Sequence, residues 1–301
     1  RAKSSFFELL RYKERPHFDP PTPEQIAKTR QATQDMMEKM TAEFPALRIA
    51  EQPVPDAENA FLLIHQLANP KTSSGLPIGK EFRQFLDDQT PWDTEIAARY
   101  LEEHADLVSQ IEHIASLNTR SSANMPEDYT GFISGRVAKH SAEILLVKAR
   151  LAAEAKNEQE ALRFVSATAN FAAHYREVET RTLLAETVAI LIERRAHRLA
   201  FEHLLPALGR DADLPRWKAA LSSRSRSAAD FTNLIRSEWN TTSRYILLPI
   251  ILREGHPETP PDGEALFRAY STRFHDDVTR LPTRSPAPTP RSRNAVGKSW
   301  T

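Results

Sequence analysis

Apolar residues recur at intervals of three and four along the stretch from Arg136 to Leu205, a spacing typical of helices with one buried face. These 70 consecutive residues contain no Gly and no Pro, although the whole chain has 8 Gly and 21 Pro. Both residue types disfavour helix interiors. The pattern therefore predicts three long helices, at about residues 132–155, 158–176 and 179–205.

Each of these helices has an apolar stripe that we expect to face a core. The stripes are Ile133, Val137, Ile144, Val147, Leu151 and Ala155 in the first helix, Leu162, Val165, Ala169, Ala172 and Tyr175 in the second, and Leu184, Val188, Leu191 and Leu199 in the third. The apolar run 189–192 predicts that the third helix is the most buried, and Pro206 is expected to end it.

The rest of the chain alternates between helical patterns and proline-rich connectors. Thr22 followed by Pro and Gln predicts a capped helix start. Further helices are expected at about 57–68, 80–88, 94–117, 215–221, 227–252 with a kink at Pro249, and 264–281, with little or no strand. We expect a connector at 1–21, a single all-helical domain at 22–281 and a Pro/Arg-rich linker at 282–301.

Two long helices joined by a short turn form an antiparallel hairpin, and small residues at their contact allow a close approach. Ala149 and Ala161 lie where a tetratricopeptide (TPR) hairpin has small residues, so this segment resembles such a hairpin. Lys148 departs from that pattern, and no second copy occurs at a 34-residue period. The predicted fold class is all-α, a TPR-like array of antiparallel helical hairpins without a true sequence repeat.

Composition excludes several kinds of protein. The 40 basic and 40 acidic residues balance, so no global charge favours nucleic acid or an anionic membrane. The absence of Cys excludes disulfides, thiolate metal sites and cysteine nucleophiles. No apolar run reaches the roughly 18–20 residues that cross a bilayer.

Three phrases support a family resemblance: Pro53-Val-Pro-Asp-Ala-Glu-Asn-Ala60, the hairpin from Ile144 to His174, and Arg293-Asn-Ala-Val-Gly-Lys298. Together they resemble a group of uncharacterised bacterial proteins that often have a membrane-spanning helix before the domain. The group usually has Pro where this chain has Ala295. The resemblance implies a helical domain in the bacterial cell envelope or periplasm, with an anchor upstream of Arg1; a cytoplasmic location is the alternative.

Known catalytic signatures are not found. The chain has no His-Glu-x-x-His motif and no glycine-rich dinucleotide fingerprint. Ser134 between Gly131 and Gly135 lacks the spacing and the preceding strand of a nucleophile elbow. Gly297-Lys298-Ser299 lacks the first glycine of a phosphate-binding loop. We therefore predict no catalytic residue, no cofactor and no metal ligand.

Polar residues on the three core helices are the remaining site candidates. They are His140 on the apolar stripe of the first helix, His174 and Tyr175 at the second turn together with Glu177 and Glu179, and a basic group late in the third helix, Arg194, Arg195, His197, Arg198 and His203. A buried histidine, a capped helix junction and a solvated basic face are the structural alternatives. The functional interpretation is a patch that binds an anion or a protein partner, because arginines on a rigid helix bind carboxylates well.

Two hypotheses of function follow. The first is a non-enzymatic protein–protein interaction or scaffolding module at the bacterial envelope, because stacked hairpins offer extended binding surfaces. Its partner is a protein or peptide, with no nucleic acid, and its membrane contact is through an upstream anchor alone. The second is a helical enzyme or small-ligand-binding protein whose site lies between the core helices near His140, His174 and Arg194.

Overall fold

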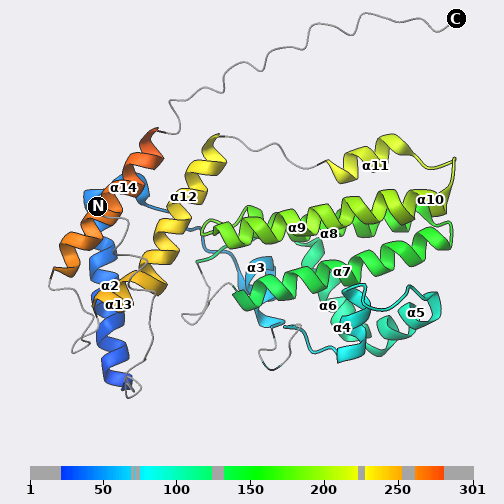
Figure 1. Cartoon of the computed structure of the whole chain (residues 1–301), viewed down its shortest axis with the longest axis horizontal. Coiled ribbons are helices and arrows are strands. Elements are labelled where there is room, and N and C mark those ends of the chain that lie inside the picture. The colour runs from blue at the N-terminus through cyan, green and yellow to red at the C-terminus, as the bar shows by residue number, and fades with distance from the viewer. Residues whose placement is uncertain are drawn as a thin grey trace, which may run out of the picture.

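The computed structural model describes residues 22–68, 71, 75–123, 132–222, 228–252 and 262–280, without the side chains of 132–134 and 228–229. Within these ranges every regular element is a helix, which confirms the predicted all-α class (Figure 1). The expected segments 1–21 and 282–301 lie outside the described residues.

The centre of the molecule is a bundle of three long helices, α7 (Phe132–Glu154), α8 (Glu158–Arg176) and α9 (Leu183–Leu199). The turn between α7 and α8 places Lys156 at a φ of 59°, and the side chain of Asn157 caps α8 by accepting a hydrogen bond from the Glu160 N–H at 3.1 Å. Thr182 caps α9 in the same way through the Ala185 N–H. The first two predicted helices are confirmed, and the third begins four residues later than expected.

The buried face of α9 differs from the prediction. Val188, Ile192 and Leu199 are buried as part of the core, but Leu184 and Leu191 are 41% and 51% exposed. The expectation that the third helix is the most buried, drawn from the apolar run 189–192, is therefore wrong, because Leu191 within that run is half exposed. The helix has apolar residues on two sides, and the side lined by Ala185, Ala189 and Ala196 packs against α7 and α8, because small side chains allow close contact.

Pro206 does not end this helix. A π-helical turn, Ala200–Leu204, follows α9 directly, and α10 (Leu205–Leu208) carries Pro206 in its first turn. The same arrangement occurs near Pro249, where the π-helical turn Ser243–Leu247 links α12 (Ala228–Thr242) to α13 (Leu248–Ile251). In a π-helical turn the hydrogen bonds join residues five apart instead of four, which shifts the bonding pattern just before the residue that lacks an N–H donor. The chain therefore stays helical across both prolines.

Four shorter helices pack around α7: α3 (Ala60–Gln66), α4 (Lys80–Leu86), α5 (Thr94–Glu103) and α6 (Ala105–Ser116). The single helix expected at 94–117 is wrong, because it breaks at His104. The Nδ1 atom of His104 lies 2.9 Å from the Tyr100 carbonyl oxygen and so takes up an acceptor of the helical ladder. α11 (Leu214–Leu221) lies on α8 and α9.

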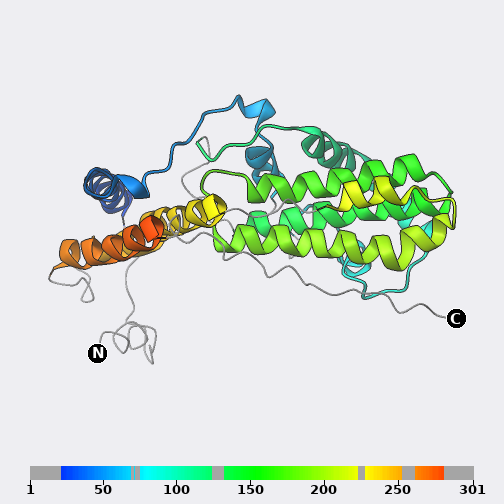
Figure 2. The same ribbon diagram turned by 90° about the horizontal axis from the view of Figure 1, so that it is seen from above.

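A second hydrophobic core forms between α2 (Pro23–Glu43), α12, α13 and α14 (Gly263–Arg280). Trp239 is fully buried there, stacks on Phe267 and donates a hydrogen bond to the Ser271 hydroxyl at 3.1 Å. The two cores lie side by side along the long axis of the molecule in both views (Figures 1 and 2). The chain enters the second core at α2, builds the whole central bundle, and returns at α12.

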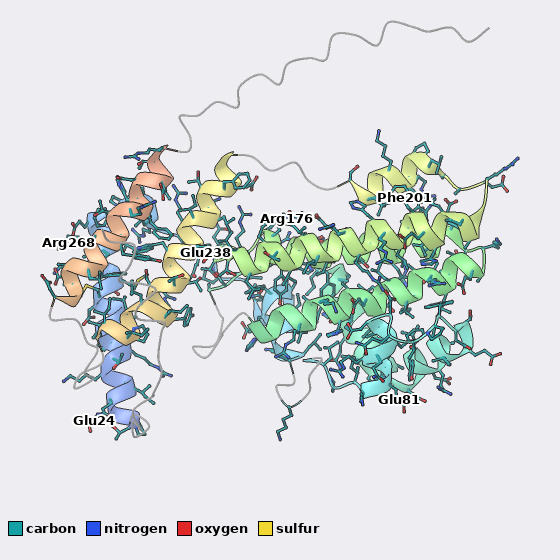
Figure 3. The ribbon with its side chains drawn as sticks, in the orientation of Figure 1. Glu24, Glu81, Arg176, Phe201, Glu238 and Arg268 are labelled. Atoms are coloured by element: carbon teal, nitrogen blue, oxygen red, sulfur yellow. The ribbon has the colours of Figure 1, made fainter. Side chains whose placement is uncertain are left out.

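Polar contacts join the two halves of the molecule. The buried guanidinium of Arg181, just before α9, donates to the carbonyl oxygens of Arg176 and Asp230. Glu238 on α12 accepts a hydrogen bond from the Leu183 N–H (Glu238 is labelled in Figure 3), and the Ser237 hydroxyl donates to the Glu179 carbonyl at 2.8 Å. The single domain expected at 22–281 thus contains two apolar cores with a polar junction.

Two finer expectations remain. The TPR-like hairpin array is not confirmed; α7, α8 and α9 all contact one another. Among the described residues, none of the helices combines the length and hydropathy that a bilayer span requires.

Candidate functional site

Two adjacent carboxylates lie where α4 ends against the central bundle. Phe85 and Leu86 are buried and anchor the end of α4. Asp87 is its C-terminal cap, and Asp88 adopts a φ of 55°, in the left-handed region that favours short polar side chains and glycine. This turn reverses the chain and places Asp87 against α7 and Asp88 against α9.

Three ionisable residues of α7 surround Asp87. The Lys139 ammonium lies 2.6 Å from Asp87 Oδ1 and 3.5 Å from Glu143 Oε1. The Nε2 atom of His140 is 3.6 Å from Asp87 Oδ1. His140 and Glu143 are both buried and lie three residues apart, on the same face of the helix. On the other side of the turn, Arg195 of α9 binds Asp88 at 2.6 Å.

Burial dominates the electrostatics of this cluster. Loss of water raises the pKa of Glu143 to about 7, against the lowering effect of Lys139, while the charge of Asp87 raises it further. Asp87 also loses water, but its hydrogen bond to Lys139 and nearby positive charges bring its pKa below the usual value. The hydrogen bond from Arg195 lowers the pKa of Asp88. Burial in this cluster therefore favours the neutral form of the Glu143 carboxyl more than an exposed position would.

A small pocket opens beside Glu143. Its walls include Trp92, Leu146, Arg150, Arg195 and Leu199, and its volume is about 30 Å³. This space has room for one water molecule or ion and is far below the size of a typical organic-ligand site, roughly 300 Å³ or more. The Arg150 guanidinium stacks over Trp92 at 4.0 Å and shapes one wall.

The predicted site residues separate into three environments. His140 and Arg195 belong to the cluster just described. His174 and Tyr175 are buried on α8, where His174 Nε2 lies 3.1 Å from the Ile114 carbonyl oxygen and Tyr175 packs edge-on against Phe61. Arg194 and Arg198 are exposed on the outer face of α9. The three residues of the small-ligand hypothesis, His140, His174 and Arg194, do not share a pocket.

Burial also decides the state of His174. Loss of water, followed by the charge of Arg120, lowers the pKa of its imidazole to about 4, although the hydrogen bond to Ile114 opposes the change. His174 is therefore neutral at physiological pH, with Nε2–H donating to the carbonyl. A neutral, buried histidine with a backbone partner has a structural role.

The outer face of α9, continued by Phe201 on the π-helical turn that follows it, forms an exposed stripe, which we call the α9 seam. Its members are spaced alternately by three and four residues: Leu184, Thr187, Leu191, Arg194, Arg198 and Phe201. Phe201 is 66% exposed and lies at the opposite end of the bundle from Arg176 (Figure 3). Arg198 pairs with Glu202 at 2.9 Å, whereas Arg194 makes no ion pair with any described residue. The seam is apolar at one end and basic in its middle.

The sequence contained signals for both features. Lys139, His140 and Glu143 place three ionisable groups on the core-facing side of a helix, which is unusual without a partner. The three–four spacing of the seam is also present in the sequence. Asp87 had no such signal, because only the packing of α4 on α7 brings it to His140.

Comparisons with known proteins found no similarity: no family model, no curated protein and no solved structure matches the chain. The resemblance to envelope proteins thus stays an expectation from the sequence.

Proposed function

We propose that this chain is a protein-interaction module that binds an acidic amphipathic helix of a partner protein along the α9 seam. The observation that carries the proposal is the row of exposed Leu184, Leu191 and Phe201 on a helix whose opposite face is firmly packed. Large apolar side chains in a row on a rigid element favour a partner, because water contact with them is unfavourable.

The spacing favours a helix as the occupant. Side chains that alternate at three and four residues form the a and d positions of helix–helix seams, where each residue fits between residues of the partner helix. The seam runs from 184 to 201, nearly five helical turns, long enough to hold a helix of ordinary length. This binding mode, a helix laid on an apolar surface, is common among peptide-recognition modules.

Charge favours an acidic partner. Arg194 and Arg198 interrupt the apolar row; Arg198 pairs with Glu202, and Arg194 makes no ion pair with any described residue. A partner helix with Leu or Ile opposite residues 184 and 191 and with Asp or Glu opposite the arginines complements both parts. Arginine forms bidentate pairs with carboxylates, which would fix the register.

The location at a bacterial envelope, with an anchor upstream, belongs to this proposal through the sequence resemblance. Fractionation of cells that produce the protein with its own upstream residues tests this part by itself: recovery with membranes supports it, and recovery in the cytosolic fraction contradicts it.

Site-specific photo-crosslinking tests the interface. A photo-reactive amino acid replaces Leu191 in one variant and Leu266 in the other; Leu266 is a matched control because it is 50% exposed on α14, in the second core. Both proteins are produced in the native cells, and the crosslinked peptides are identified by mass spectrometry. The expected result is one acidic, amphipathic peptide joined to position 191 and absent from position 266.

Affinity measurements with the identified peptide then test whether apolar contacts and charge pairing hold it on the α9 seam. The identified peptide should lose at least about tenfold in affinity with Leu191→Ser or Arg194→Glu, and a Glu→Arg change in the peptide should restore binding to Arg194→Glu. Leu266→Ser should leave the affinity unchanged. A crosslink from position 191 to lipid, or to a second copy of this chain, would overturn the proposal, as would equal labelling from both positions.

A further inference from the structure

Asp87, His140 and Glu143 bring three potential metal-ligand atoms to within 4.8 Å of one another. We infer that these three residues form a binding site for a divalent transition-metal cation of the zinc class, with the pocket beside Glu143 as its open side. One imidazole and two carboxylates suit zinc, manganese or iron(II), whereas calcium and magnesium prefer oxygen ligands alone. This site is independent of the α9 seam.

The distances are close to those that a metal needs. Ligands at roughly 2.0–2.1 Å from a tetrahedral centre lie about 3.4 Å from each other. His140 Nε2 and Asp87 Oδ1 are already 3.6 Å apart. All three ligand atoms lie within 4.8 Å of one another, so an adjustment of little more than 1 Å would bring them to that spacing. His140 and Glu143 are held on one rigid helix, so Asp87, on the turn after α4, is the ligand that adjusts.

A second observation supports a cation there. Glu143 is buried, and its Oε2 atom accepts no hydrogen bond from any described residue. A buried carboxylate oxygen without a donor is unfavourable, and most such atoms in proteins have a partner. A metal ion bound beside Asp87 and His140 would supply one. Glu143 also lines the pocket, which leaves room for a water molecule as a fourth ligand.

Lys139 gives the inference a test in which a substitution should increase the affinity for the metal. Its ammonium contacts the same two carboxylates that would bind the metal, at 2.6 Å and 3.5 Å, so the ammonium and the metal are alternative occupants. The Lys139 side chain is 43% exposed and can turn toward solvent when a metal enters. Removing this ammonium should therefore strengthen metal binding, which no purely structural role of the cluster would produce.

The experiment titrates chelator-treated full-length protein with zinc chloride, followed by calorimetry and thermal melting, with manganese, magnesium and calcium chlorides as parallel arms. The expected result is one zinc site per chain and weak or no binding of magnesium and calcium. Asp87→Asn and His140→Gln should each weaken zinc binding at least about tenfold, and Lys139→Gln should strengthen it about tenfold. Cobalt(II) should give the intense visible absorption of a four-coordinate site.

Two matched controls lie on a comparable ion pair. Lys148, also on α7, binds Glu112, and neither residue belongs to the group of Asp87, His140 and Glu143, so Lys148→Gln and Glu112→Gln should leave zinc affinity unchanged. Circular dichroism confirms that each variant folds; if His140→Gln does not fold, the pair Asp87→Asn and Lys139→Gln decides alone. No zinc uptake by either the wild type or Lys139→Gln would overturn the inference. Uptake that Asp87→Asn and Lys139→Gln both leave unchanged would overturn it equally.

Discussion

The buried imidazole of His174 predicts a specific acid sensitivity of the fold. Its pKa is about 4 in the folded chain, against an ordinary value of 6.5. Between these values the unfolded chain binds a proton that the folded chain rejects, so the free energy of unfolding falls as pH falls. The neutral imidazole of His174 makes its full contribution to the free energy of unfolding above about pH 6.5, and this contribution disappears as the pH falls toward 4.

The size of the effect follows from the shift. Each pKa unit corresponds to about 1.4 kcal/mol, so the full loss is about 3 kcal/mol, and at pH 5 the loss is about 2 kcal/mol. This is a large share of the roughly 5–15 kcal/mol that stabilises a typical domain.

The perturbation that isolates this group is His174→Gln. The glutamine amide can donate to the Ile114 carbonyl as Nε2–H does, but it does not titrate. Urea denaturation of both proteins at pH 7 and pH 5, followed by circular dichroism, gives four free energies of unfolding. The wild type should lose about 2 kcal/mol more than the variant between the two pH values, because all other titrating groups cancel in the difference.

An independent measurement checks the premise. The chain has 10 histidines, and the nuclear magnetic resonance signal that is missing from His174→Gln belongs to His174. The midpoint of the pH titration of this signal should lie near pH 4. A midpoint near 6.5, or parallel pH profiles of wild type and variant, would refute the reasoning from burial.

Three further predictions concern stability. Phe267→Ala should cost about 3–5 kcal/mol locally, so that hydrogen exchange accelerates in α12–α14 while α7–α9 remain protected; uniform acceleration would contradict separate cores. Gly263→Ala places a Cβ in steric clash with Ile251 Cγ2 and should lower stability in urea by about 1–3 kcal/mol. Glu158→Ala removes the acceptor of the Trp217 indole N–H at 2.8 Å and should lower the free energy of unfolding by about 1–3 kcal/mol in the same assay. Glu158→Gln keeps an acceptor oxygen and should lose much less stability.

Local signals in the sequence were sufficient for much of the fold. The capping box at Thr22 is present, with both hydrogen bonds made, and α2 begins at the expected Pro23. The end of α7 and the start of α8 were predictable, because Asn157 and the acidic residues after it mark the junction between two helices. These features depend on neighbours within four residues, which the sequence shows directly.

Features that depend on tertiary packing were not predictable. α9 has two apolar faces, and the sequence does not show that the alanine-lined face packs inward and leaves Leu191 exposed. The break at His104 depends on a side chain competing for a backbone carbonyl. Of the proposed metal ligands, His140 was a candidate from its place on an apolar stripe, but Asp87 reaches it only through the fold of α4 on α7.

The route of the chain through its second core has a consequence for biosynthesis. α2 leaves the ribosome early, but its packing partners α12, α13 and α14 are translated only after the entire central bundle. The contact between the Arg236 guanidinium and the Ala46 carbonyl closes a loop of 190 residues. At a translation rate of roughly 5–20 residues per second, the apolar side of α2 lacks its packing partners for on the order of ten seconds or more. During that interval the apolar residues of α2 lack their packing partners, and exposed apolar surface on an incomplete chain favours aggregation.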